Sequence, residues 1–220
     1  QVSTDPKMEG FYDAIKSAIQ VELKPTSERT ILVVFKDKER LKGFETFLQN
    51  RPINKGSELC VPGVLSDDIS FGKRDACIKA AMFEGGVTLM TRSYGRGTDF
   101  ICSSKTINDR GGVHIIQTFL PMMISETKQI KGRTCRQDNN GSYREIFWAQ
   151  DIADDDIATF DELRCWLKSP AERAKMGLPV DHSNVEDIIE MRRCQKDDAR
   201  VDKMLQSDIE NSQQCRDTER

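Results

Sequence analysis

The sequence predicts an α/β protein in which a parallel β-sheet is covered by helices on both faces. Short apolar runs rich in β-branched residues alternate with segments of helical periodicity through the first 150 residues. Such runs are typical of strands buried on both faces, and their alternation with helices indicates parallel βαβ units. From residue 183 onward the chain has no Pro or Gly, which predicts one long C-terminal helix.

The expected elements follow from these patterns in chain order. The helices are predicted over 7–22, 36–50, 75–83, 125–136, near 160–167 and from 183 to about 213, and the strands over 30–35, within 58–65, and over 87–91, 113–119 and 142–149.

Apolar spacing justifies each helix, and apolar continuity justifies each strand. Phe11, Ile15 and Ile19 recur at the three- and four-residue intervals of a helix face, as do Leu41 and Phe44 in the next helix. The runs TILVVF, VTLMT and VHIIQTF lack polar alternation and are expected in the sheet interior. The run within 58–65 is weaker because it contains a proline. The acidic run DIADDD at 151–156 predicts a solvated surface loop.

Composition excludes several classes of protein. With 37% hydrophobic and 31% charged residues, the chain is expected to be globular. A net charge of -3 argues against a general nucleic-acid coat. The seven cysteines are scattered without a CxxC pair, so we interpret them as reduced cytosolic thiols. The two histidines lie far apart, and we expect no metal site. No apolar run approaches the roughly 18–20 residues of a membrane span.

The first candidate site is the glycine-rich segment RSYGRGTD at 92–99, which follows the predicted strand at 87–91. Glycines let backbone N–H groups approach an anion. Because ligands of parallel sheets collect at the carboxyl ends of strands, this segment suits a phosphate or nucleotide edge. The candidate nucleotide-binding residues here are Gly95, Arg96, Gly97 and Asp99.

The second candidate site is QIKGRTCRQ at 129–137. Gln129, Arg133 and Arg136 are spaced i, i+4 and i+7, which places them on one face if the segment is helical. Arginine supplies a planar, permanently charged fork that can bind a developing phosphate charge.

Each of these patterns also has a purely structural interpretation. Gly95 and Gly97 are compatible with a plain turn, Arg133 and Arg136 with a solvated helix face, and Arg96 with a carboxylate partner. His114 lies in an apolar strand and is expected to be a hydrogen-bonded core residue. Met122 and Met123 suit packing more than a peptide-gripping role. The long charged helix suits either a solvated face or a partner-binding surface.

The motifs resemble those of one family. GGVTLMTRSYGRGTDF looks like motif V of superfamily 2 motor ATPases, specifically of SecA, the preprotein translocase motor, and QIKGRTCRQDNNGSYR is similar to the SecA motif VI region. TILVVFKDKERLKGFETFL is similar to the opening strand and helix of the second RecA-like domain. The chain departs from the family pattern at FLPMMISETK (119–128), where SecA is charged. Lys131 replaces a usual arginine, and Cys135 and Asp138 replace usual glycines.

The resemblance implies a fold and a domain arrangement. The implied fold is a RecA-like parallel sheet with helices on both faces, of the P-loop NTPase class and helicase C-terminal type, followed by a long C-terminal helix. Residues 1–150 would form the second nucleotide-binding domain and 151–182 a helical connector. Residues 183–220 would resemble the start of the SecA helical scaffold.

The resemblance also implies half of an ATP site. The chain has no GxxxxGK[ST] sequence, so it is expected not to hydrolyse ATP alone. ATP, with Mg²⁺ held by an absent N-terminal domain, would lie between that domain and this one. Arg133 and Arg136 would act as arginine fingers, and Gly95, Arg96, Gly97 and Asp99 would line the cleft. Thr91 and Gln129 would be secondary contacts.

Three classes of function follow. The first is half of an ATP-driven motor for protein translocation, whose partners would be the N-terminal domain and a polypeptide substrate. The second is half of a superfamily 2 nucleic-acid helicase, which the acidic charge disfavours, so nucleic acid is not an expected partner. The third is a degenerate, non-hydrolysing interaction module. We expect a cytoplasmic protein, and peripheral contact with a membrane or translocon is compatible with this chain.

Overall fold

A computed structural model provides the fold. It describes residues 2–3, 8–24, 29–95, 98, 100, 104–134, 139–155, 157–168, 172 and 185–218. The chain divides into two units: unit 1 holds residues 1–121 and 125–152, and unit 2 holds 122–124 and 153–220. The expected domain boundaries near 150 and 182 stay a prediction. In the described part of the chain, no helix combines the length and the apolar character needed to cross a membrane.

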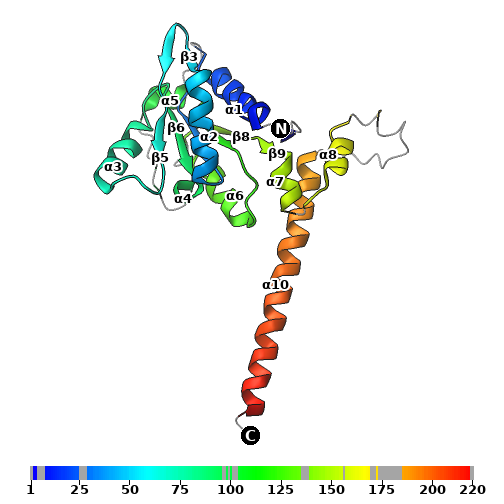
Figure 1. The fold of residues 1–220 in the computed structure, drawn as a ribbon. Helices are drawn as coiled ribbons and strands as arrows, with labels where there is room; N and C mark the ends of the chain where they lie inside the picture. The colour runs from blue at the N-terminus through cyan, green and yellow to red at the C-terminus, as the bar shows by residue number, and fades with distance from the viewer. Residues whose placement is uncertain are drawn as a thin grey trace. The chain divides into compact units, whose positions relative to one another are not determined.

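Unit 1 is built around a five-stranded parallel sheet, as the sequence predicts (Figure 1). The strand order is β5-β6-β2-β7-β8, and every neighbouring pair is parallel. The central strands β2, β6 and β7 are buried along their whole length, which explains their continuous apolar sequences. The sheet strands are β2 (Ile31–Phe35), β5 (Gly63–Leu65), β6 (Val87–Thr91), β7 (Val113–Gln117) and β8 (Gly141–Glu145).

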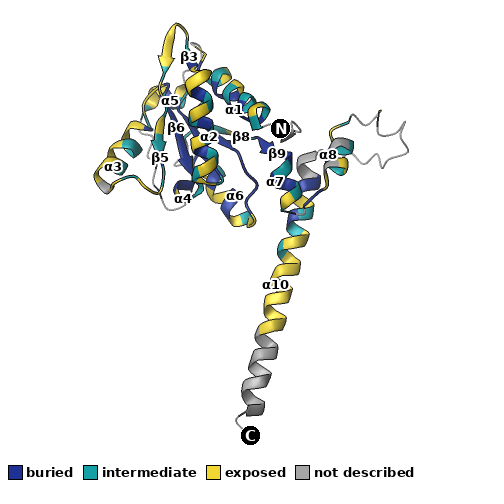
Figure 2. Ribbon diagram, in the orientation of Figure 1, coloured by how far each residue is buried: buried dark blue, intermediate teal, exposed yellow. Residues whose placement is uncertain are grey.

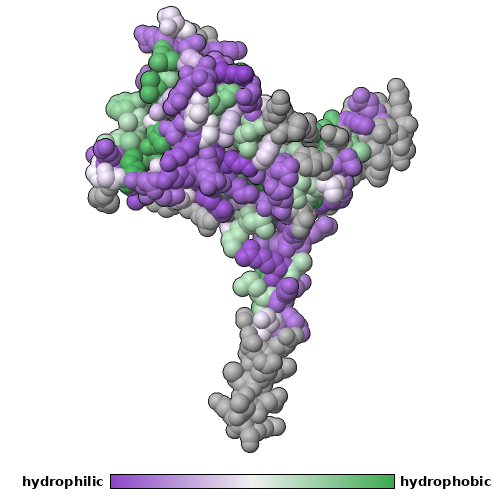
Figure 3. All heavy atoms as spheres, viewed as in Figure 1, coloured by the Kyte–Doolittle hydropathy of each residue, from purple (hydrophilic) through white to green (hydrophobic). Residues whose placement is uncertain are grey.

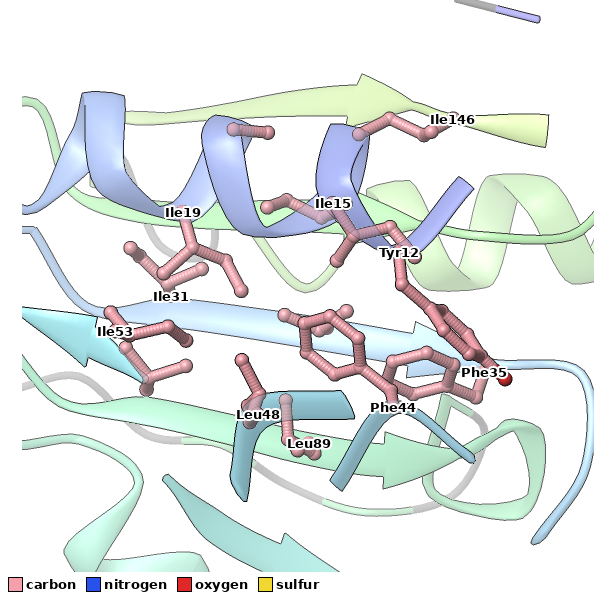
Figure 4. Close-up of a cluster of buried hydrophobic side chains, with 14 of the residues drawn as sticks. Tyr12, Ile15, Ile19, Ile31, Phe35, Phe44, Leu48, Ile53, Leu89 and Ile146 are labelled. Carbon is pink, nitrogen blue, oxygen red and sulfur yellow. The ribbon is translucent and has the colours of Figure 1, made fainter. Parts of the chain in front are cut away.

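Helices cover both faces of this sheet. On one face α1 (Met8–Glu22) and α2 (Lys38–Asn50) pack Ile15 and Phe44 onto Ile31 and Phe35 (Figure 4). Val33 belongs to the same core. On the other face, Leu32, Val34 and Met90 pack with residues of the segments that follow β6 and β7, including Tyr94 and Ile130. The alternation of β2 side chains between the two cores is the two-residue period of a strand. The other helices with most of their residues in unit 1 are α3 (Phe71–Ala80), α4 (Arg92–Gly95), α5 (Lys105–Asp109), α6 (Ile124–Lys131) and α7 (Ala149–Asp154).

Pro62 divides the expected strand within 58–65 into two. β4 (Glu58–Cys60) forms an antiparallel hairpin with β3 (Ile53–Lys55), whereas β5 joins the edge of the main sheet. Proline has no N–H to donate and is not accommodated inside a strand. The strand that we expected over 142–149 is also two, β8 and β9 (Phe147–Trp148), and β9 pairs with the short β1 (Val2–Ser3).

The prediction of a solvated acidic loop over 151–156 is wrong for residues 151–154. Residues 149–154 form α7, and Asp151 is buried with only 8% of its surface exposed. Its carboxylate accepts a hydrogen bond from the Arg40 guanidinium at 2.8 Å, and Arg40 stacks on the ring of Trp148. A run of acidic residues does not reveal which of them meets an arginine from a distant helix.

Unit 2 contains α8 (Phe160–Trp166) and α10 (Val185–Thr218), both near their predicted positions. The Thr159 side chain caps α8 in a capping box with Glu162. Glu162 also forms an ion pair at 2.7 Å with Arg192 of α10, and hydrogen bonds from Arg192 and Thr159 lower the pKa of Glu162 to about 2. Farther along α10, Val201, Met204 and Leu205 are exposed (Figure 2).

His114 lies in β7 with 3% of its surface exposed, and its Nδ1 is 2.7 Å from the hydroxyl oxygen of Ser142. Its Nε2 has no hydrogen-bond partner among the described residues, so the expected core histidine is only half satisfied. Burial is the main reason that the pKa of His114 falls from 6.5 to about 4, and Arg29 and Arg144 lower it further.

This low pKa predicts a loss of stability in acid. Between pH 6.5 and about 4 the unfolded chain binds a proton at His114 that the folded chain does not. Stability is therefore full above pH 6.5 and falls by about 3 kcal/mol as the pH approaches 4. Urea unfolding of the wild type and of His114→Gln across this range checks the expectation. The difference between their free energies of unfolding should depend on pH, and a constant difference would contradict it.

Candidate functional site

The candidate site begins where β6 ends. We expected residues 92–99 to form a glycine-rich loop, but the first four residues form the helical turn α4. The Tyr94 hydroxyl donates to the carbonyl of Ser66 at 3.1 Å. Gly95 is packed so closely that a Cβ there would lie 3.0 Å from Cγ1 of Ile130. A residue with a Cβ at this position would require the Ile130 side chain to shift by a few tenths of an ångström, and glycine avoids this crowding.

The second segment corrects the predicted helix over 125–136. Helix α6 ends at Lys131, and the next residues tighten into a turn in which Arg133 N–H donates to Ile130 and Thr134 N–H to Lys131. The Thr134 hydroxyl donates to the same Lys131 carbonyl at 2.9 Å. Gly132 is a poor helix former, and these three-residue hydrogen bonds are typical of helix ends. Gln129 and Arg133 therefore do not share a helix face: Gln129 is exposed, whereas Arg133 is buried.

Arg133 and Gly95 meet directly. The Nε–H of Arg133 donates to the Gly95 carbonyl oxygen at 3.2 Å, and only 8% of the arginine surface is exposed. Burial lowers the pKa of Arg133 below its usual range, although a guanidinium stays charged at neutral pH. A guanidinium fixed through Nε keeps its two Nη groups as a fork for another ligand. The geometry thus joins the two segments that the sequence singles out.

Of the remaining predicted site residues, the structure describes only Thr91. Thr91 is buried at the end of β6, and its hydroxyl lies 3.4 Å from that of Ser93. Four predicted residues lie outside the described part of the chain, and their roles stay predictions: Arg96, Gly97, Asp99 and Arg136.

Sequence reasoning missed the Arg92–Glu126 pair. Arg92 Nε and Nη2 donate to the two carboxylate oxygens of Glu126 at 3.1 and 2.7 Å, and Glu126 is only 1% exposed. The Arg92 guanidinium also lies over the Phe119 ring, 5.5 Å from its centroid. The available signal was an arginine directly after a buried strand and a glutamate shortly after the apolar stretch 119–124, but neither identifies its partner.

Lys131, which stands where the resembled family usually carries arginine, contacts β8. Its Nζ lies 4.1 Å from the centre of the Tyr143 ring and 3.6 Å from a Glu145 carboxylate oxygen. These contacts hold the end of α6 against β8. The substitution therefore keeps a cation with a structural role here.

A separate cavity of about 410 Å³ lies between α2, the β3–β4 hairpin and strands β5 and β6. Its lining is mostly apolar, and hydrophobic side chains gather over this region on the left of Figure 3. Gly95, Gln129 and Arg133 do not line it. In the residues that the structure describes, no three His, Cys, Asp or Glu side chains gather as metal ligands would.

Comparisons with known proteins add a family resemblance. No protein-family model matches the chain. The chain is 37% identical over 79 residues to protein translocase subunit SecA 3 of Magnetococcus marinus, a match covering 36% of this chain and 12% of that protein. It is 41% identical over 73 residues to protein translocase subunit SecA 2 of Rhodopirellula baltica, covering 33% and 10%. The matches thus span about a tenth of the relatives' length.

A solved structure extends the comparison to the fold. The C-terminal part of the Fun30 ATPase domain superposes with a TM-score of 0.51 at 14% identity, covering 70% of this chain and 46% of that one. At this low sequence identity, the comparison supports a shared fold and nothing more. That fold is the parallel sheet covered by helices that is described above. The chain is thus SecA-like in sequence, and its sheet-bearing unit has the fold of a second RecA-like domain of the helicase C-terminal type.

Proposed function

We propose that this chain supplies one wall of an ATP site in a SecA-like motor that moves polypeptides. The carrying observation is the contact between Arg133 and the carbonyl of Gly95, which joins the segments resembling motifs V and VI. A charged, partly desolvated guanidinium held by one nitrogen is suited to stabilise charge on a phosphoryl group during transfer.

The rest of the site would come from elsewhere. Because the sequence contains no GxxxxGK[ST] loop, the β- and γ-phosphates and Mg²⁺ would be bound by a second domain. ATP would lie between the two domains, with Arg136, Arg96, Gly97 and Asp99 facing it from this side. The polypeptide substrate belongs to the same proposal, and it is supported by the similarity to protein translocase subunits. A translocon contact at the membrane surface and a cytoplasmic location are further parts of this proposal.

Measurement of ATP turnover tests the proposal. The 220-residue chain alone should not hydrolyse ATP, whereas the protein carrying the preceding nucleotide-binding domain should, and an unfolded polypeptide should stimulate it. Absence of turnover in the longer protein would instead indicate a degenerate interaction module. Stimulation by RNA or DNA, with binding that weakens steeply as salt rises, would indicate a helicase.

A further inference from the structure

We infer that Arg92 and Glu126 are positioning residues for Arg133 and act on it through Gly95 and Ile130. The starting observation is the geometry of the pair. Two parallel hydrogen bonds at 3.1 and 2.7 Å join the guanidinium to a carboxylate that is 1% exposed. A two-point pair of this kind fixes orientation as well as distance.

In the residues that the structure describes, the pair lies in a row of contacts that joins α4 to α6 and to the turn after it. Glu126 and Ile130 are four residues apart and therefore lie on the same face of α6. Glu126 binds Arg92 at the start of α4, and Ile130 packs against Gly95 at its end. Arg133, just beyond α6, then donates to the Gly95 carbonyl.

This arrangement makes the orientation of α6 depend on the ion pair. Rotation of α6 about its axis would separate Glu126 from Arg92 and move Ile130 off Gly95, and Arg133 would lose its acceptor. The stacking of Arg92 on Phe119 restrains the pair from the β7 side. The clamp, formed by Arg92, Glu126, Ile130, Gly95 and Arg133, therefore transmits any movement of the segment after β6 to the arginine.

Arginine Nε–H resonances of the 220-residue chain test the positioning without any catalysis. The Arg133 signal, assigned by its absence in Arg133→Lys, should exchange slowly with water because it is bonded to Gly95. Glu126→Gln should make this exchange at least about 10-fold faster. Asp13→Asn is the matched control, since Asp13 also binds an arginine at 2.7 Å but both partners are 48% exposed. It should leave the Arg133 signal unchanged.

A second variant guards against misfolding. Arg92→Lys keeps the charge beside Glu126 but removes the two-point fork, and it should also accelerate exchange at Arg133 Nε. An unchanged Arg133 signal in a folded Glu126→Gln or Arg92→Lys chain would overturn the inference. So would an equal effect of Asp13→Asn.

The expected effect of Arg92→Lys on ATP turnover rests on the proposed function, and it is tested separately from the positioning of Arg133. In the longer protein, Arg92→Lys should lower kcat about 10- to 100-fold while changing ATP affinity little, because a displaced catalytic group loses rate more than binding. Equal losses of kcat and affinity would contradict positioning. If the wild type hydrolyses no ATP, the proposed function fails, and the resonance measurement still decides whether the clamp holds Arg133.

Discussion

Arg133→Ala is expected to lower ATP turnover by the longer protein about 10³-fold or more, the range in which arginine fingers act. ATP affinity should change far less, because the guanidinium is proposed to bind charge that develops during phosphoryl transfer. Arg133 is prepared for this by its hydrogen bond to Gly95, which orients the side chain before any nucleotide arrives. Single-turnover hydrolysis and equilibrium binding of ATP measure the two quantities separately.

Two controls separate lost catalysis from lost structure. Arg133→Lys keeps the positive charge but cannot offer a fork, so it should recover only a small part of the rate. Arg51→Ala removes an exposed arginine that pairs with Asp13 at the surface, and turnover should stay near the wild-type value. Melting of the 220-residue variants reports any loss of folding. Wild-type turnover in a folded Arg133→Ala protein would remove Arg133 from the proposed site.

The central strands of the sheet were predictable because each is buried on both faces and therefore appears in the sequence as an unbroken apolar run. The predicted strand VTLMT has the same first and last residues as β6. The runs over 30–35 and 113–119 contain β2 and β7 with small differences at their ends. Each strand interior faces a core on both sides, so the apolar run and the strand coincide. The long C-terminal helix was predictable for a similar reason, since the chain offers no Pro or Gly to end it.

The candidate site was predictable in its residue types but not in its geometry. Gly95 and Arg133 were both singled out, yet their contact crosses 38 residues of sequence, and the helix expected to carry Arg133 ends before it. The predicted helix ran to residue 136, but the N–H groups of Arg133 and Thr134 make three-residue hydrogen bonds in place of helical ones. Glu126 was passed over because its buried partner becomes evident only when α4 and α6 are packed together.

Gly112→Ala is expected to unfold unit 1 or to cost more than about 4 kcal/mol, a loss at the extreme of single substitutions. Gly111 and Gly112 end α5 with positive φ values of 97° and 72°. The N–H of Gly112 donates to Ile107 at 2.8 Å and that of Gly111 to Asn108 at 3.0 Å, the two bonds of a Schellman turn. A Cβ on Gly112 would overlap the carbonyl of Asn140, which leads into the edge strand β8.

The clash cannot be relieved at a low cost in free energy, because hydrogen bonds restrain the backbone at both Gly112 and Asn140. Arg29 Nε donates to the Gly112 carbonyl at 3.0 Å, and the Asn140 side chain donates to Asn108 at 3.0 Å. Urea unfolding should rank the variants by cause. A Cβ on Gly111 would come no closer than 3.4 Å to the Arg29 guanidinium, an ordinary contact, so Gly111→Ala should lose only about 1–2 kcal/mol from its positive φ. Gly72→Ala, in α3 with nothing within 4 Å, should be neutral or stabilising. If Gly112→Ala were no worse than Gly111→Ala, then β8 would not be held against the α5–β7 turn as the contacts imply, and the loss would reflect φ alone.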